Sequence, residues 1–186
     1  MMKSQFSFLA FLISIFLIVS CHTSQHSQHS SLISDQYDTS TKSTSFSYLG
    51  DFSIQAEIPG KWKYLGFNNT SRDHIFTDSL KQNLFIFKGT RGVSSFNKDN
   101  LDGDAFIDLF YKWDSDWYLS QNPNLKTRVL EHISNKYIVV EYTDSLLETT
   151  MLYGTKNGNG IRVSITSRVN KTAQTDFVSK VYSNLN

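Results

Sequence analysis

Few side chains in this sequence have the type and position to do chemistry, and the first of them is a thiol. Cys21 is the only cysteine among 186 residues, so a disulfide within the chain is excluded. It lies directly behind an apolar run, Phe6 to Val19, and directly ahead of a serine-rich segment. A thiol at such a boundary predicts a site of processing and modification rather than a redox residue.

The first twenty residues have the pattern of a secretory signal peptide. Lys3 gives the start a positive charge, and the fourteen residues from Phe6 to Val19 are apolar except Ser7 and Ser14. A membrane-spanning helix needs about 20 apolar residues, and this run is shorter. We therefore expect residues 1–20 to be removed by cleavage.

The residues at the expected cleavage point, Ile18-Val19-Ser20-Cys21, resemble the lipobox of bacterial lipoproteins. The resemblance implies that the Cys21 thiol receives a diacylglycerol and that the new amino group is acylated after cleavage. Each buried CH₂ contributes roughly 0.8 kcal/mol, so two or three acyl chains anchor a protein stably. The resemblance thus implies an envelope protein, and His22 in place of an aspartate favours the outer membrane, with the domain facing the periplasm.

No arrangement of nucleophile and base for catalysis is recognisable. His74 and His132 are the only histidines after residue 45, and a structural or surface role is favoured for both. We predict that the protein is not an enzyme and has no cofactor. Trp62, Tyr64, His74 and His132 are the candidate residues of a binding surface.

Three histidines near the expected mature N-terminus resemble short metal-binding tracts, namely His22, His26 and His29. No acidic residue lies beside them, and a site on a flexible segment is entropically weak. We predict no metal site there.

A second pattern, Asn100-x-Asp102-Gly103, resembles the middle of a calcium-binding loop. Lys98 and Leu109 occupy the positions where such a loop requires an acid and a bidentate glutamate. We expect instead that a helix begins near Asp102 and that carboxylates stabilise its first turn.

The charge of the expected mature chain is balanced. Removal of residues 1–20 takes away one basic residue, Lys3, and leaves 17 Lys and Arg against 17 Asp and Glu. This balance argues against a phosphate-tracking surface and therefore against nucleic acid as a partner. The membrane affinity must then come from the lipid.

The chain divides into three parts. Residues 1–20 are the signal peptide, and residues 21–45 are expected to be the lipidated cysteine and a flexible tether, because twelve of the 24 residues from His22 to Ser45 are Ser or Thr. Residues 46–186 are long enough for one globular domain with a core of ordinary size.

The periodicity of residues 46–186 predicts an α+β fold. Residues 52–59 alternate apolar and polar as a half-buried strand does, and further strands are expected at 61–67, 74–78 and 83–89. Strands are again expected at 127–133, 136–142, 147–155 and 161–169, with a hairpin turn at Asn157 to Gly160. A helix at about 172–184 closes the chain. We expect a single, mainly antiparallel sheet with helices packed on it.

The period becomes helical between Asp104 and Leu119. An apolar stripe there is expected to face the sheet: Phe106, Leu109, Phe110, Trp113 and Trp117. We expect Trp113 and Trp117 to lie in the core, and Asp114 and Asp116 to be solvated.

Four segments together resemble the PsbP-like α/β/α sandwich: "FSIQAEIPGKW", the aromatic helix after the fourth strand, "NGNGIRVSIT" and "FVSKVYSNL". The resemblance covers nearly the whole domain and implies a fold shared by an extrinsic photosystem II protein and many bacterial lipoproteins. No partner-binding or metal-binding motif of that superfamily is found here, so no site residue is carried over.

These observations favour a non-catalytic binding or accessory domain, anchored by lipid, for an envelope protein or other periplasmic partner. One alternative is a small-ligand carrier or envelope enzyme that uses a groove between sheet and helix. Another is an immunity-type lipoprotein, which no residue specifically favours.

Overall fold

A computed structural model describes residues 32–186, except residues 51, 146–147 and 167–170. These residues belong to a compact unit that runs from Ser31 to Asn186. The predicted signal peptide, the lipobox with Cys21, and His22, His26 and His29 lie outside the described residues.

Strands dominate the described part of the chain. The first group of elements is β1 (Leu32–Asp38), β2 (Ser43–Leu49), β3 (Ile54–Pro59), β4 (Lys63–Asn68), β5 (Asp73–Thr77), β6 (Asn83–Thr90) and the short 3₁₀ turn η1 (Arg91–Val93). The second group is α2 (Gly103–Gln121), β7 (Lys126–Ile133), β8 (Tyr137–Thr143), β9 (Glu148–Lys156), β10 (Asn159–Thr166) and α3 (Lys171–Ser183).

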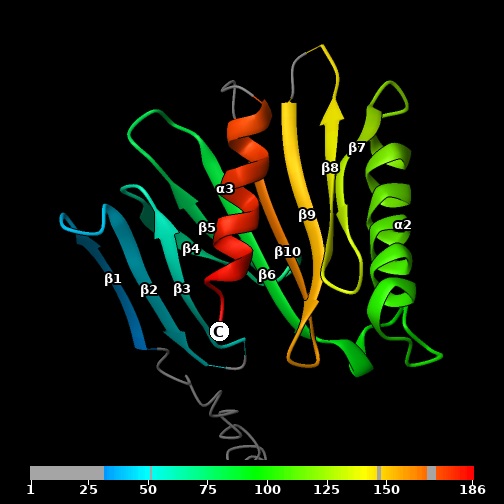
Figure 1. The fold of residues 1–186 in the computed structure, drawn as a ribbon, viewed down its shortest axis with the longest axis horizontal. Helices are drawn as coiled ribbons and strands as arrows, with labels where there is room; N and C mark the ends of the chain where they lie inside the picture. The colour runs from blue at the N-terminus through cyan, green and yellow to red at the C-terminus, as the bar shows by residue number, and fades with distance from the viewer. Residues whose placement is uncertain (1–31, 51, 146–147, 167–170) are drawn as a thin grey trace, which may run out of the picture. The chain divides into compact units, whose positions relative to one another are not determined.

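The strands form two antiparallel sheets (Figure 1). The small sheet has the order β1-β2-β3, and the large sheet has the order β4-β5-β6-β10-β9-β8-β7. The predicted α+β class and the two packed helices are confirmed. The strands are divided between two sheets, however, where a single sheet was expected.

The small sheet begins within the segment that was predicted to be a tether. Residues 32–45 include all of β1 and the start of β2, so the predicted boundary at Ser45 is wrong. In β2 the side chains of Thr44 and Phe46 are buried, while Ser45 between them is exposed. This alternation is the period-two pattern of a strand, which the high serine and threonine content of the segment obscured.

The large sheet carries a separate hydrophobic core on each face. On one face α2 packs against β8 and β9, and Phe106, Phe110 and Tyr153 are buried between them. On the other face α3 packs against β9, β10 and β3, and the small sheet covers β4 and β5 through Phe46. Leu152 and Tyr153 are neighbours on β9 and belong to different cores, as alternation along a strand requires.

The predicted hairpin between β9 and β10 is confirmed. Lys156 pairs with Asn159, so the loop consists of two residues, Asn157 and Gly158. Their φ angles are 52° and 75°. Positive φ at both positions is the geometry of a type I′ turn, which matches the twist of the strands it joins.

The helix α2 begins near Asp102, as predicted in place of a calcium-binding loop. Asp102 is the N-cap and accepts a hydrogen bond from the backbone N–H of Gly103. Asp104 in the first turn accepts bonds from Ser134 Oγ and the N–H of Asn135, both at 2.6 Å. The acidic residues at this point therefore cap the helix and tie it to the turn between β7 and β8.

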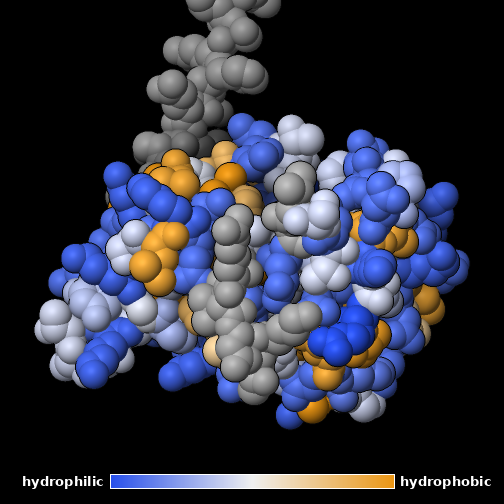
Figure 2. All heavy atoms as spheres, turned by 90° about the horizontal axis from the view of Figure 1, so that it is seen from above, coloured by the Kyte–Doolittle hydropathy of each residue, from blue (hydrophilic) through white to orange (hydrophobic). Residues whose placement is uncertain are grey.

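Within the described ranges, no helix is long and apolar enough to cross a membrane. On the face seen in Figure 2, hydrophobic residues form separate spots in a largely hydrophilic surface. Exposed large hydrophobic residues are mostly single, but Trp113 and Trp117 lie together on one helix.

Candidate functional site

The candidate site is a groove with a volume of about 480 Å³. It lies between α2, strands β6 and β10 and the turn between β4 and β5. We call it the aromatic groove, because six aromatic residues line it: Phe87, Phe96, Phe110, Trp113, Trp117 and Tyr118. Four hydroxyl residues and three charged residues complete the lining: Thr70, Ser71, Ser94, Ser95, Arg72, Asp114 and Arg162. Its size lies within the range of small-ligand sites.

The helix α2 presents a different face to the sheet than the sequence predicted, and the groove lies beside the tryptophans that this orientation exposes. Trp113 and Trp117 were expected in the core, but they are 47% and 57% exposed. Asp114 was expected to be solvated and is buried, together with Ser115. These predictions for Trp113, Trp117 and Asp114 are wrong, whereas Asp116 is solvated as expected.

A buried ion pair explains this orientation. Arg162 lies in the middle of β10 and is 7% exposed. Its Nη1 donates to both carboxylate oxygens of Asp114, at 2.7 and 2.9 Å. Its Nη2 donates to both oxygens of Asp73 on β5, at 3.0 and 2.8 Å. An unpaired buried charge is very unfavourable, so the helix presents its carboxylate to the sheet and its indoles to the side.

A chain of hydroxyl groups extends this network across the sheet. The Tyr153 hydroxyl donates to Asp114 Oδ2 at 2.9 Å. It lies 2.9 Å from the hydroxyl of Tyr142, which in turn lies 2.5 Å from Ser115 Oγ. Because Tyr153 donates to the carboxylate, it accepts from Tyr142 and Tyr142 accepts from Ser115. The network links α2 to four strands of the sheet, β5, β8, β9 and β10.

The surroundings of the network keep Arg162 charged and Tyr153 protonated. Burial lowers the pKa of Arg162, but the carboxylates of Asp114 and Asp73 more than offset this effect, so the pKa lies above its ordinary value. Burial also raises the pKa of Tyr153 well above its ordinary value. The tyrosine hydroxyl therefore stays protonated and continues to donate to Asp114.

Contacts between aromatic rings support the walls of the groove. The Phe96 ring stacks on Phe110 at 5.2 Å and on Trp113 at 4.9 Å. Trp117 makes an edge contact with Tyr118 at 4.9 Å. Aromatic contacts of this kind stabilise by about 0.5–1.5 kcal/mol beyond the buried area. The indoles are thus exposed, and each contacts one further aromatic ring of the groove wall.

The groove offers recognition more readily than acid–base chemistry. Both carboxylates of the network are bound by one guanidinium, and no nucleophile with an oriented base faces the groove within the described residues. Among those residues, no group of three or more His, Cys, Asp or Glu could hold a metal ion. What the groove provides is a polar floor between aromatic walls.

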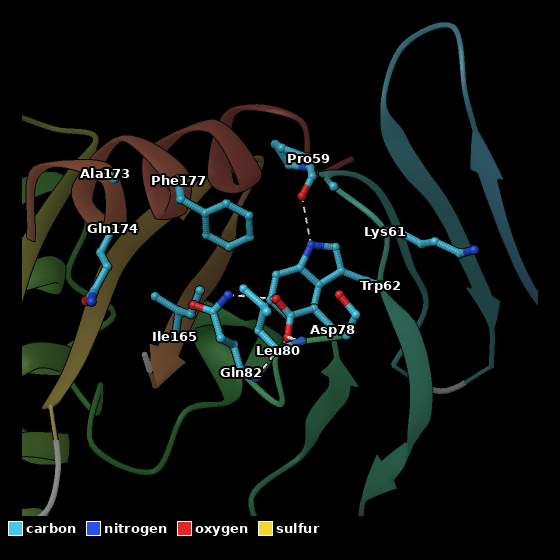
Figure 3. Close-up of a pocket in the computed structure, with 12 residues that line it drawn as sticks. Pro59, Lys61, Trp62, Asp78, Leu80, Gln82, Ile165, Ala173, Gln174 and Phe177 are labelled. Atoms are coloured by element: carbon cyan, nitrogen blue, oxygen red, sulfur yellow. Dashed lines mark hydrogen bonds between the residues drawn. The ribbon is translucent and has the colours of Figure 1, made fainter. Parts of the chain in front are cut away.

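A second, smaller pocket of about 300 Å³ contains Trp62, one of the sequence-predicted residues (Figure 3). Trp62 was a candidate for a binding surface, and it is only 7% exposed. Its indole N–H donates to the carbonyl of Pro59 at 2.7 Å, and its ring lies 5.5 Å from that of Phe177 on α3. Lys61 points away from the pocket. Trp62 therefore closes the core beneath α3.

Tyr64 and His74 are neighbours, and His74 is buried while Tyr64 is partly buried. The Tyr64 hydroxyl is 3.3 Å from His74 Nδ1, and His74 Nε2 is 3.1 Å from the carbonyl of Phe52. Because Nε2 faces a carbonyl it donates, so in the neutral ring Nδ1 accepts from Tyr64. Burial raises the pKa of Tyr64 to about 12 and lowers the pKa of His74. Both residues link β4 and β5 beneath the small sheet.

His132 lies far from the other three predicted residues along the sheet. It is on β7, the strand at the opposite end from β4. Its Nε2 is 3.3 Å from Asp104 Oδ1, and its side chain is 42% exposed. The four predicted residues therefore do not form one surface.

Sequence reasoning missed the aromatic groove and its ionic floor. One signal for it was present: Arg162 lies between Ile161 and Val163 in the middle of an expected central strand. A buried arginine requires carboxylate partners, and Asp73 and Asp114 were candidates. The sequence did not indicate which carboxylates the fold brings to β10.

Comparison with solved structures identifies the fold. The chain is similar to cyanobacterial PsbP (CyanoP) from Synechocystis sp. PCC 6803, with a TM-score of 0.50 and 14% sequence identity over 83% of this chain and 91% of that one. The domain therefore has a PsbP-like fold, as predicted. At this level of identity the likeness concerns the fold alone.

A protein from Bacteroides thetaiotaomicron VPI-5482 matches at a TM-score of 0.38 and 14% identity. The match covers 72% of this chain but only 44% of the other. No family model matches the sequence, and no curated protein matches it.

Proposed function

We propose that this protein is a lipid-anchored accessory protein of the bacterial envelope, whose domain binds a partner without catalysing a reaction. The observation that carries the proposal is the aromatic groove, in which Trp113 and Trp117 are both exposed. Exposed tryptophans near one another are unusual on a solvated surface and are typical of binding sites.

The polar groups of the groove floor support binding over catalysis. Asp114 and Asp73 each make two hydrogen bonds to Arg162. A general acid or base must exchange its proton with substrate, and these carboxylates are already engaged by a guanidinium. The PsbP-like fold is consistent with an accessory role.

The lipobox supports the anchor. If Cys21 is acylated, the wild-type chain in its native host should incorporate labelled palmitate and fractionate with membranes. Cys21→Ala should abolish the label and leave a longer, unprocessed precursor. Labelling that is unchanged in Cys21→Ala would rule out the anchor without affecting the proposed role of the groove.

The partner can be sought by chemical crosslinking in the native host, followed by mass spectrometry. A partner that uses the groove should be recovered with the wild type and lost with Trp113→Ala/Trp117→Ala. The control is Leu80→Ala, which removes a 73% exposed side chain away from the groove. Crosslinks identical in all three chains would contradict binding at the aromatic groove.

A further inference from the structure

We propose that the aromatic groove binds a neutral saccharide, an inference that rests on the proposed binding function and names its ligand class. The argument uses three features of the groove: the spacing of its indoles, the balance of its charges and the chemistry of its rim. Each feature favours a ring that is apolar on its faces and hydroxylated at its edges.

The two indoles suit successive rings of an oligosaccharide. Trp113 and Trp117 are one helical turn apart, a spacing that gives about 5–6 Å between Cβ atoms. They are 47% and 57% exposed, and Trp113 is fixed from one side by Phe96. The C–H faces of a sugar ring are apolar and pack flat on an aromatic ring, so two indoles one helical turn apart can each carry one ring.

The charges of the groove are internally balanced. Arg72 and Arg162 line it, Asp114 lines it, and Asp73 lies directly behind Arg162, so the four formal charges sum to zero. Both terminal nitrogens of Arg162 are engaged by carboxylates. Arg72 lies over the ring of Phe52 at 5.1 Å. The charged groups of the floor are engaged with one another and the four charges cancel, so a neutral ligand is favoured over a phosphate or a cationic group.

The rim supplies hydroxyl groups around the aromatic walls. Thr70 and Ser71 come from the turn between β4 and β5, and Ser94 and Ser95 come from the segment after η1. Short hydroxyl side chains both donate and accept hydrogen bonds. Polar groups at fixed points around an apolar wall set the orientation of a ligand, and sugar hydroxyls are matched to them.

The test is isothermal titration calorimetry of the full-length chain in a sugar-free zwitterionic detergent. The probes are chitotriose, cellotriose and maltotriose, with decaproline as a probe of the other ligand class that docks in aromatic grooves. We expect at least one trisaccharide to bind. Trp117→Ala should weaken its affinity about tenfold or more, equivalent to about 1.4 kcal/mol, and Leu80→Ala should leave it unchanged.

A conservative variant distinguishes loss of binding from loss of folding. Trp117→Phe keeps an aromatic platform and should bind between the wild type and Trp117→Ala, with the same circular dichroism spectrum for all three chains. The inference is overturned if none of the trisaccharides binds, if Trp117→Ala binds as tightly as the wild type, or if only decaproline binds.

Failure of this inference is distinguishable from failure of the proposed function. A chain that binds none of the sugars, yet loses an envelope crosslink in Trp113→Ala/Trp117→Ala, would retain its accessory role with another ligand. A chain that binds a sugar through Trp117 would assign the ligand class whether or not a protein partner is recovered.

Discussion

Arg162 on β10 and Asp114 on α2 are 48 residues apart in the chain and are joined by hydrogen bonds of 2.7 and 2.9 Å. Both residues are buried, and the same guanidinium also binds Asp73. This pair sets the rotation of α2 on the sheet. It thereby determines that Trp113 and Trp117 face the groove and not the core.

Removal of the Asp114 carboxylate should destabilise the domain strongly. Asp114→Ala leaves Arg162 with only Asp73 as a carboxylate partner and removes the carboxylate acceptor of Tyr153, and loss of hydrogen bonds to a charged group costs about 1.5–3 kcal/mol. The free energy of unfolding, measured by urea titration, should fall by this amount. Asp116→Ala is the matched control two residues away, because its exposed pair with Lys112 contributes only about 0.2–1 kcal/mol. Equal effects of the two variants would contradict the role of the buried pair.

The tryptophans of the groove should contribute little to stability. Trp117→Ala removes a side chain of a residue that is 57% exposed, whereas Phe110→Ala removes a ring from a residue that is 2% exposed on the same helix. Truncation of a buried phenylalanine costs about 3–5 kcal/mol, and we expect less than about 1 kcal/mol for Trp117→Ala. Thermal unfolding of both variants checks this. A loss in Trp117→Ala as large as that in Phe110→Ala would show that the indole is structural.

Stability should fall as the pH drops below the ordinary pKa of histidine, because burial lowers the pKa of His74. The unfolded chain then binds a proton at a pH where the folded chain does not. The contribution of neutral His74 to stability is therefore fully present above about pH 6.5 and is lost as the pH falls toward the lowered pKa. Urea titrations between pH 5 and 8 should show a smaller decrease in His74→Gln than in the wild type. His132→Gln, a change at a largely exposed residue, is the control. Parallel curves for wild type and His74→Gln would contradict this linkage.

Gly154 should not tolerate a side chain. A Cβ there would lie 2.8 Å from the carbonyl oxygen of Lys136 and 2.7 Å from the ring of Tyr182 on α3. Overpacking of a filled core costs about 1–3 kcal/mol, which lowers Tm by several degrees in a chain of this size. Gly92→Ala is the control, because its nearest neighbouring atom is 3.6 Å away. A Tm for Gly154→Ala equal to that of the control would mean that α3 packs less closely on β9.

The fold could be predicted from local patterns where each element followed its own period. The hairpin of β9 and β10 was expected from its turn residues, although the strands predicted at 147–155 and 161–169 lie at 148–156 and 159–166, because the loop has only two residues, Asn157 and Gly158. The small sheet was missed in part, because Thr44 is buried yet reads as a polar residue of a low-complexity segment.

The candidate site could not be predicted in the same way, since it depends on pairing across the fold. Asp73, Asp114 and Arg162 are separated by 41 and 48 positions, and no local period relates them. Hydropathy alone places tryptophan in the core and aspartate in solvent. Here the pairing of Asp114 with Arg162 outweighs hydropathy, so α2 presents Asp114 to the sheet and leaves Trp113 and Trp117 exposed.

Photo-crosslinking in the native host tests the central claim most directly. The full-length chain would carry p-benzoylphenylalanine at position 117, in the groove, or at position 80, on an exposed turn outside it. Binding through the aromatic groove predicts a discrete crosslinked product from position 117, absent from position 80 and lost when Trp113 is also changed to Ala. No product from position 117, or the same products from both positions, would contradict the claim that this groove is where the protein binds.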